Sequence, residues 1–508
     1  MVRIGEPLSL EDVESVARGA DATLPATAVA RVRAARDRVE RAVAAGETVY
    51  GVTTGFGSLA NVAVPAAEAS ALQHAIVRSH ATAVGPFLPR EEARAMLLLR
   101  AHVLAFGNSG VRVEIIERML EFLRRDLIPA VPEQGSLGAS GDLAPLACLA
   151  LPLIGGGSFL SPTGGSIPAA EVLDASGIPP LALGAKEGLA LVNGTQGMLA
   201  VGALALLRLA RLVKTADVVA AMTIEGALGS DRPFDPRLHA LRPHPGQVAS
   251  ASNLRRLLAG SPIVASHHDS PHMLQDAYSL RCAPQVHGAT RGALAYARGV
   301  LDVEVNAVSD NPVVFPEQGD VVSGGNFHGQ PVATALDALT LATVPLASVS
   351  ERRLYRLLDA TTSNGLPPFL VADAGRNSGF MLAQYTAASL VSESKSLAHP
   401  ASVDSIPSSA GQEDHVSMGM IAARHLRAVV ADAEVVLALE ALAAAQALDL
   451  RAPVAAGAAT GAARDAIRAR VPFLAEDREL GPDIAAAVDL VRGGGLVAAA
   501  EAAIGALD

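Results

Sequence analysis

Apolar positions recur with helical spacing over most of the chain. Residues 26–45 place Ala and Val on one face and Arg and Glu on the other, which predicts an amphipathic helix that ends near Gly46. The same spacing predicts helices over residues 90–106 and 112–125. Residues 157–180 are rich in Gly, Ser and Pro, which predicts a short hairpin or an irregular excursion.

From about residue 187 the apolar runs become longer than an ordinary globular helix. They predict a central bundle of long helices joined by polar connectors, and functional residues are expected in those connectors. The predicted helices span 187–228, 285–307, 329–358, 376–398 and 415–448, and the connectors span 229–250, 259–275, 308–328, 359–375 and 399–414.

Composition supports a helical fold class. Half of the 508 residues are hydrophobic, but only 3% are aromatic and none is Trp, so the apolar material is mostly Ala, Leu and Val. Such material favours closely packed helices over an aromatic-rich sheet sandwich. We therefore predict a mainly α fold: a smaller mixed N-terminal region over 1–186, a long central helix bundle over 187–480 and a C-terminal helical tail over 481–508.

Charge and cysteine content narrow the partners and the compartment. A net charge of -11 argues against nucleic-acid binding, which requires a basic face. Two cysteines, Cys148 and Cys282, cannot build a disulfide framework, so a cytoplasmic location is expected, and the N-terminal stretch has no apolar run of signal-peptide type. The most apolar runs, such as 198–207 before Arg208, are too short to span a membrane and predict buried helices.

The most informative segment is 135–146, GSLGASGDLAPL. A stretch of Gly and Ser usually forms a turn, and Ala-Ser-Gly alone is a common tripeptide. The segment is not a nucleophile elbow, because G-x-S-x-G would need glycine where Asp142 stands. Gly141 has no Cβ, so its nitrogen can approach the carbonyl carbon of Ala139 closely. The composition of the segment therefore allows these two atoms to come into contact.

Several segments, covering roughly residues 5–480, resemble motifs of the histidine and phenylalanine ammonia-lyase family. Each alone is a common loop sequence, but their joint occurrence in the order of the family makes coincidence negligible. Besides 135–146 they are 50–57 (YGVTTGFG), 191–196 (LVNGTQ), 275–282 (QDAYSLRC), 309–312 (SDNP), 324–329 (GGNFHG), and 399–407 (HPASVDSIP) leading into 412–415 (QEDH).

The resemblance implies a prosthetic group that the chain makes from Ala139, Ser140 and Gly141. This group is 4-methylidene-imidazol-5-one (MIO). The nitrogen of Gly141 attacks the carbonyl carbon of Ala139, and loss of water closes a five-membered ring. A second loss of water removes the hydroxyl of Ser140 and leaves an electron-poor alkene that an amino group can attack. Asp142 is expected to assist the cyclisation, and no external cofactor is implied.

The same resemblance implies roles for other residues. Tyr50 matches the candidate base for the β-proton of the substrate, and a phenol must be ionised by its surroundings to act near neutrality. Arg281 matches the residue that binds the substrate carboxylate, for which its planar fork is suited. The amides could otherwise be ordinary loop-stabilising groups. Asn193 and Gln275 match partners of the carboxylate or the MIO oxygen, Tyr278 and Asn311 match supports of the MIO, and Phe327 matches a wall of the pocket.

Two positions indicate the histidine branch of the family. Ser79-His80 resembles the pair whose second residue meets an imidazole, and Glu413 stands where phenylalanine enzymes usually have Gln. A carboxylate and a histidine offer an acceptor and a donor to an imidazole, whereas an unpaired carboxylate would oppose a phenyl ring. Gly329-Gln330 and Gly411 depart from the histidine pattern, which commonly has Ala-Glu and Asn there.

The resemblance therefore implies deamination of L-histidine to trans-urocanate and ammonia, the first step of histidine degradation, by a homotetramer with sites shared between subunits. The alternatives are a tyrosine or phenylalanine ammonia-lyase or aminomutase with the same chemistry, and a non-catalytic helical assembly protein. The sequence has neither a P-loop nor a dinucleotide fingerprint. His267, His268 and Asp269 with His272 fit no zinc signature, so no metal site is predicted.

Overall fold

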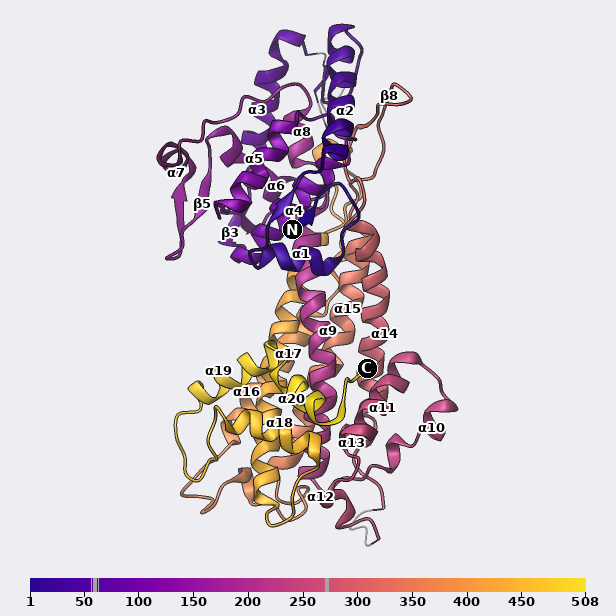
Figure 1. The fold of residues 1–508 in the computed structure, drawn as a ribbon, viewed down its shortest axis with the longest axis vertical. Coiled ribbons are helices and arrows are strands. Elements are labelled where there is room, and N and C mark those ends of the chain that lie inside the picture. The colour runs from indigo at the N-terminus through magenta and orange to yellow at the C-terminus, as the bar shows by residue number, and fades with distance from the viewer. Residues whose placement is uncertain (56, 58–61, 63, 270–273) are drawn as a thin grey trace. The chain divides into compact units, whose positions relative to one another are not determined.

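The computed structural model describes residues 1–55, 57, 62, 64–269 and 274–508. The chain is mainly helical, as the composition predicts (Figure 1). Its residues divide into two compact units, and each unit is discontinuous along the sequence. The predicted division at residues 186 and 480 concerns consecutive segments and stays a prediction. The first unit comprises Met1–Ala205, Arg298–Asp337 and Pro400–Arg424, and the second comprises Leu206–Ala297, Ala338–His399 and His425–Asp508.

The first unit combines short paired strands with helices of short and medium length. Its strands pair as β1 (Val2–Arg3) with β2 (Ala22–Thr23) in parallel, and antiparallel as β3 (Val84–Phe87) with β4 (Pro132–Gln134), β5 (Ser158–Leu160) with β6 (Ser166–Pro168), and β7 (Val313–Phe315) with β8 (Asp320–Val322). Its helices include α1 (Leu10–Ala17), α2 (Ala26–Ala44), α3 (Ala69–His80), α4 (Arg90–Ala105), α5 (Val113–Arg124), α6 (Leu143–Ala150), α7 (Ala169–Ser176) and α8 (Glu187–Val192).

The predictions for the first third of the chain are confirmed in their main features. Helices α2, α4 and α5 match the three predicted helices to within a residue at each end. The hairpin expected within 157–180 is β5–β6, where Phe159 pairs with Ile167, and α7 follows it. Helices α1 and α6 were not predicted, because each has only 8 residues and offers few turns over which a periodic pattern can be recognised. Helix α3 was not predicted either, because the polar Gln73 lies on its buried face.

Three of these helices pack against one another: α3, α6 and α8 form all three pairwise contacts. Each has a predicted site residue at one end. His80 is the last residue of α3, the Ala-Ser-Gly segment ends directly before α6, and Asn193 follows the last residue of α8. Packing of the three helices therefore fixes where these three parts of the site lie relative to one another.

Four long helices contribute residues to both units: α9 (Gln196–Gly226), α14 (Ala283–Glu304), α15 (Gln330–Leu358) and α17 (Gly419–Leu450). Three of the predicted long helices correspond to α14, α15 and α17, and the predicted helix over 376–398 is α16 (Met381–Leu397). The single helix predicted over 187–228 is wrong, because α8 and α9 are separated at Asn193–Thr195. Asn193 is extended, with φ -100° and ψ 114°, and Gly194 has φ +142°, so the chain cannot remain helical there.

The second unit consists of helices and their connections. The connectors predicted over 229–250 and 259–275 contain short helices as well as loops. Besides parts of the long helices, this unit has α10 (Pro236–Ala240), α11 (Pro245–Leu257), α12 (Pro262–Ala265), α13 (Tyr278–Arg281), α16, α18 (Ala458–Arg468), α19 (Gly481–Arg492) and α20 (Gly495–Ile504). The last two form the helical part of the predicted C-terminal tail.

A buried ion pair joins two long helices inside the second unit. Arg353 on α15 donates from Nε (2.5 Å) and Nη2 (2.8 Å) to the two carboxylate oxygens of Glu440 on α17, and both side chains are fully buried. Thr223 and Ser350 donate one further hydrogen bond to each oxygen, at 2.7 and 2.6 Å. Every carboxylate oxygen therefore has two donors, which offsets the cost of taking the charges out of water.

Among the described residues, α9 and α15 are long and apolar enough to span a membrane by length and composition alone. Within their most apolar stretches 83% and 61% of the residues are buried by the rest of the chain, which is usual for core helices. The predicted limit is wrong for α9, because its apolar character continues beyond Arg208. Cys148 and Cys282 are both free thiols.

The contribution of the Arg353–Glu440 ion pair to the free energy of unfolding can be tested by mutation. Glu440→Ala leaves the Arg353 charge buried and unpaired, so we expect the free energy of unfolding to fall by about 3–5 kcal/mol. Arg237→Ala removes an exposed pair with Asp235 and should cause no measurable change. Denaturant unfolding followed by circular dichroism measures both, and equal effects would contradict this account.

Candidate active site

The Ala-Ser-Gly segment is a tight loop pressed against Gly194. Gly141 has φ +71°, and a Cβ at this position would overlap the carbonyl oxygen of Gly194. The N–H of Gly194 donates to the carbonyl of Ser140 (3.1 Å), and the N–H of Asp142 donates to the carbonyl of Gly194 (2.7 Å). Only glycine at position 141 permits this approach to Gly194. The predicted approach of the Gly141 nitrogen to the carbonyl carbon of Ala139 stays a prediction.

Ser140 and Asn193 are in direct contact through Ser140 Oγ and Asn193 Oδ1. The amide nitrogen of Asn193 donates to Asp310 Oδ1 (3.1 Å) and to the carbonyl oxygen of Asn311 (3.0 Å). Because both of these partners only accept, the amide group has one orientation, with its oxygen toward Ser140. The serine hydroxyl is therefore the donor in its contact with Asn193.

Asp142 directly precedes helix α6 and is fully buried beside the loop. Its carboxylate accepts from the N–H of Met198 (2.7 Å) and from Ser136 Oγ (2.8 Å). Burial raises the pKa of Asp142 from 3.8 to about 6, although these hydrogen bonds oppose the rise. A carboxylate with such a pKa can both take and return a proton near neutrality.

A cavity of about 750 Å³ lies beside the loop within the first unit. It brings together residues from segments that are far apart in sequence, as the resemblance predicts. Asn193 does not line it, but its side chain contacts Ser140, which does. The predicted residues that line it are Tyr50, His80, Ala139, Ser140, Asn311, Phe327 and Glu413, and the further lining residues include Leu143, Leu189, Ser323, His328, Gln412, Asp414 and His415.

Tyr50 is positioned by the hydrophobic residues on either side of it. Val49 and Val52 are buried in a cluster that also contains Val39 of α2 and Val314 of β7. The hydroxyl of Tyr50 accepts a hydrogen bond from the N–H of Gly57 (2.9 Å). This donor stabilises negative charge on the phenolic oxygen. Phe56, in the same motif, lies outside the described residues.

His80 lines the cavity, and the position of the proton on its ring follows from its contacts. Its Nδ1 lies 2.8 Å from the carbonyl oxygen of Ile76, which only accepts, so Nδ1 carries the proton. Burial lowers the pKa of His80 and favours the neutral ring. The Nε2 of that ring is an acceptor, whereas the sequence predicts that the histidine supplies a donor.

One carboxylate oxygen of Glu413 is buried without a hydrogen-bond donor. Oε2 has no hydrogen-bond partner among the residues that the structure describes. Burial raises the pKa of this carboxyl group. A Cβ placed on Gly57 would lie 3.5 Å from Glu413 Oε1, so the carboxylate lies beside the residue that bonds Tyr50. A buried acceptor without a partner costs stability until a donor reaches it.

His328 and His415, to which the resemblance assigns no role, also line the cavity. The rings of His328 and His415 are stacked, with centroids 5.9 Å apart and an angle of 5° between the planes. Both lie within the family motifs, but nothing in their spacing indicates that they stack. The departures at Gly329-Gln330 and Gly411 neighbour lining residues in sequence, yet none of these three residues lines the cavity itself.

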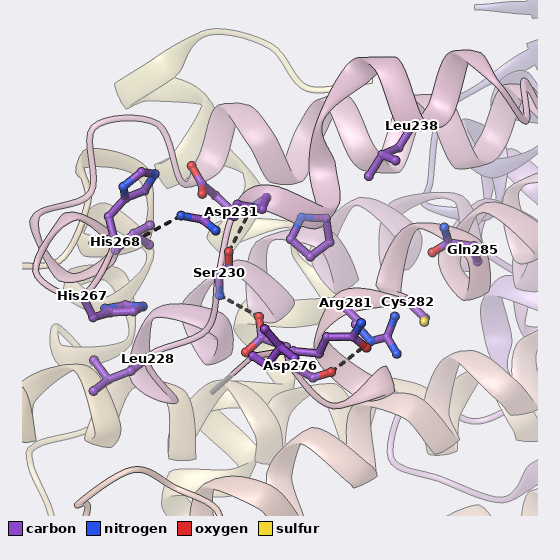
Figure 2. A pocket seen from close by; sticks show the side chains of 15 residues that line it. Leu228, Ser230, Asp231, Leu238, His267, His268, Asp276, Arg281, Cys282 and Gln285 are labelled. Atoms are coloured by element: carbon purple, nitrogen blue, oxygen red, sulfur yellow. Dashed lines mark hydrogen bonds between the residues drawn. The ribbon is translucent and has the colours of Figure 1, made fainter. Parts of the chain in front are cut away.

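The remaining predicted site residues belong to the second unit. Gln275 and Arg281 line a cavity of about 430 Å³ in that unit, and Figure 2 shows Arg281 donating to the carbonyl of Asp276 (3.0 Å). The Arg281 guanidinium lies 4.5 Å from the centre of the Tyr278 ring, and Tyr278 is 72% exposed. The roles of these three residues toward a substrate stay predictions.

No group of three or more His, Cys, Asp and Glu side chains suited to a metal ion occurs in the described part of the chain. His267 contacts the carbonyl oxygens of Ile263 (2.9 Å) and Gly229 (3.1 Å), so its ring is used within the fold. His272, which completes the candidate cluster, lies outside the described residues.

A helical fold with an Ala-Ser-Gly loop beside a cavity that Tyr50, His80 and Glu413 line is the arrangement expected of a helical lyase. A model of the aromatic amino acid lyase family matches residues 8–469, and the chain belongs to that family. It is 56% identical to the histidine ammonia-lyase of Anaeromyxobacter sp. (strain K), over 97% of this chain and 98% of the relative. The histidine ammonia-lyase of Deinococcus radiodurans is 54% identical, over 94% of this chain and 91% of the relative.

Solved structures agree with this assignment. A histidine ammonia-lyase from Trypanosoma cruzi has a TM-score of 0.91 and 40% identity, covering 99% of this chain and 95% of that one. A tyrosine aminomutase from Streptomyces globisporus has a TM-score of 0.93 and 40% identity, covering 99% and 98%. The fold is therefore shared by members of the family that differ in substrate and product.

The raised pKa of Asp142 predicts a pH dependence of stability. Between pH 3.8 and about 6 the folded chain binds a proton that the unfolded chain has lost, so stability falls as pH rises through this window. The loss should be complete above about pH 6 and amount to roughly 3 kcal/mol. Asp142→Asn should remove this dependence.

Thermal unfolding of the parent and of Asp142→Asn at pH 4, 5, 6 and 7 measures the effect as a Tm difference that changes with pH. Asp465→Asn, at a carboxylate that is 67% exposed, serves as the control and should keep the parent profile. A constant difference between Asp142→Asn and the parent over this range would show that Asp142 is not the titrating group.

Proposed function

We propose that the chain is an ammonia-lyase that converts L-histidine to trans-urocanate and ammonia without oxidation, the first step of histidine degradation. The observation that carries the proposal is that Glu413 lines the cavity and has a carboxylate oxygen without a hydrogen-bond partner among the described residues. An imidazole N–H would satisfy it, whereas a phenyl ring would leave it buried without a donor. The high identity to histidine ammonia-lyases over nearly the whole chain supports the same substrate.

Glu413 and His80 would receive the imidazole ring of the substrate. Both residues line the cavity, and Glu413 offers an acceptor in Oε2. A substrate ring protonated on both nitrogens offers two N–H donors, and a neutral ring offers one. The ionised form of Glu413 would favour the protonated ring, because a charge-assisted hydrogen bond is stronger than a neutral one.

Residues 139–141 fit the precursor of an MIO group. Gly141 accepts no side chain, the Ser140 hydroxyl has a fixed hydrogen-bond partner, and the carboxylate of Asp142 adjoins the loop. The MIO group would supply an electron-poor alkene to which the amine of the substrate adds. This chemistry would then lie at the wall of the cavity that Glu413 and His80 also line.

Tyr50 would take the β-proton of the substrate at its phenolic oxygen. The N–H of Gly57 donates to this oxygen and stabilises the charge that a base must carry. Phe327 contributes an apolar wall to the same cavity and limits its solvation. Charges inside a less hydrated cavity interact more strongly with each other.

A second copy of the chain would complete the site. Gln275, Tyr278 and Arg281 belong to the second unit, and the exposure of Tyr278 leaves its ring open to a partner. Exposed apolar side chains also mark surfaces that associate. We infer a homotetramer in the cytoplasm, where the free thiols remain reduced. The exposed apolar side chains include Tyr296, Val303, Leu341, Tyr355, Leu382 and Tyr385.

The specificity prediction concerns Glu413→Gln. Removing the carboxylate should lower kcat/KM for L-histidine by about ten- to a hundredfold, because a charge-assisted hydrogen bond to the ring is lost. Turnover of L-phenylalanine or L-tyrosine, if any, should fall much less. The measurement follows the ultraviolet absorbance of urocanate, cinnamate and coumarate separately, with Glu171→Gln, at an exposed position, as the control.

The parent chain should produce urocanate from L-histidine and little product from the other two amino acids. Cinnamate or coumarate as the main product would replace the proposed substrate by an aromatic amino acid. Equal losses for all substrates in Glu413→Gln would contradict the role of this carboxylate. No product from any of them would favour a non-catalytic relative.

Mixed assemblies test whether sites are shared. Ser140→Ala should be inactive because it cannot form the MIO group, and Arg281→Met should be strongly impaired because it cannot hold the substrate carboxylate. Co-expressed, the two should recover about a quarter of the parent activity, since a random assembly joins intact parts from two chains in one site in four. Activity no higher than that of the separate variants would show that each chain supplies its own complete site.

A further inference from the structure

Lys186, directly before helix α8, has an unfavourable backbone conformation and a buried charge. Its side chain is fully buried, and its backbone has φ +70° and ψ -19°, a left-handed conformation that a long side chain rarely adopts. Burial of the ammonium group adds a second cost. Two unfavourable features at one residue indicate that surrounding interactions hold its side chain in place, as is common near functional sites.

The partner of Lys186 is Asp310, which is also fully buried. Lys186 Nζ donates to Asp310 Oδ2 (2.9 Å). The other carboxylate oxygen, Oδ1, accepts from the amide nitrogen of Asn193 (3.1 Å) and from the N–H of Asn311 (2.7 Å). Asp310 therefore links the ammonium group to the amide that faces Ser140.

Asp310 remains an acceptor toward Asn193. Burial acts to raise the pKa of Asp310, but the charges of Lys186 and Arg100 outweigh it and hold the pKa below the ordinary value. Arg100 fixes the backbone of the same residue, because its Nη1 donates to the carbonyl of Asn193 (2.5 Å) and to Gln196 Oε1 (2.8 Å). Both the side chain and the main chain of Asn193 are thus held by buried charged groups.

We propose that Asp310, held by Lys186, is a positioning residue that orients Asn193 for maturation of the Ala139-Ser140-Gly141 loop. The inference rests on the proposed function, since it concerns the group that this function requires. Asp310 keeps the amide oxygen of Asn193 toward Ser140, where it accepts the serine hydroxyl and fixes the direction of Oγ.

The orientation of Oγ matters in the second dehydration. First, the nitrogen of Gly141 bonds to the carbonyl carbon of Ala139, whose oxygen leaves as water with the amide hydrogens of Gly141 and Ser140. Oγ then leaves as a second water with the hydroxyl and Cα hydrogens of Ser140, and a carbon–carbon double bond forms. A leaving group held in one rotamer reaches the geometry of elimination more often than one that rotates freely.

Two charge-neutral double variants separate positioning from stability. K186M/D310N and K186M/D310L both remove the buried ion pair and leave no unpaired charge at these two positions. The amide introduced by D310N retains a carbonyl oxygen, which the N–H of Asn311 can hold in place for Asn193. The side chain introduced by D310L has no acceptor. Glu187→Gln is the matched control, because Glu187 is the next residue, is fully buried and pairs with Arg112 instead.

Intact-mass spectrometry of the folded protein at intervals after synthesis measures maturation directly, since the mature chain is lighter by two water molecules. We expect the parent, Glu187→Gln and K186M/D310N to mature at similar rates and K186M/D310L to mature about tenfold more slowly or worse. Thermal unfolding should give similar Tm values for the two double variants. If K186M/D310L does not fold, K186M/D310A tests the missing acceptor without filling the site.

Equal maturation rates of the folded D310N and D310L (or D310A) double variants would overturn the inference. So would an equal delay in Glu187→Gln, which would attribute the effect to general loss of stability. A parent chain that never loses the mass of two waters would instead refute the proposed function. The two failures are therefore distinguishable in one experiment.

Discussion

The close approach of Gly141 to Gly194 is the constraint on which the rest of the site depends. Neither residue tolerates a side chain: a Cβ on Gly141 would overlap the backbone of Gly194, and one on Gly194 would lie 2.5 Å from the carbonyl oxygen of Ser309. Two main-chain hydrogen bonds then join the loop to the segment between α8 and α9. This contact places Ser140 beside Asn193, and Ser140 also lines the cavity. The loop geometry therefore depends on where α8 ends and α9 begins.

The same contact explains where sequence reasoning about the fold succeeded and where it failed. Long periodic runs predicted α15 and α17 well, because burial of one face over many turns leaves a clear pattern. The break between α8 and α9 was missed because apolar residues continue on both sides of it. Helix α3 was missed because it buries the polar Gln73, whose side chain forms hydrogen bonds with the backbone of Gly51 and Leu189. Polar residues that serve tertiary contacts interrupt the apolar pattern.

Most of the candidate site could be predicted because its residues lie in motifs of distinctive order, and the first unit brings Tyr50, His80, Phe327 and Glu413 to one cavity. What the motifs could not supply is the chemistry that depends on neighbours. The proton on Nδ1 of His80 follows from the carbonyl of Ile76, which no motif reveals. The contact of Lys186 with Asp310 could not be predicted for a similar reason, since only the fold brings these two residues together.

Two buried carboxylates show how the protein separates structure from function. Glu440 receives two donors at each oxygen, and its partner Arg353 is as deeply buried as it is, so the pair has no capacity left for a ligand. Glu413 has a buried oxygen with no donor among the described residues, and a cavity adjoins it. An unsatisfied acceptor costs stability in the empty site, and this cost is recovered only when a bound molecule supplies a donor. On the proposed role of Glu413, a molecule without such a donor would recover none of it, and discrimination between ligands would already be present in the unliganded protein.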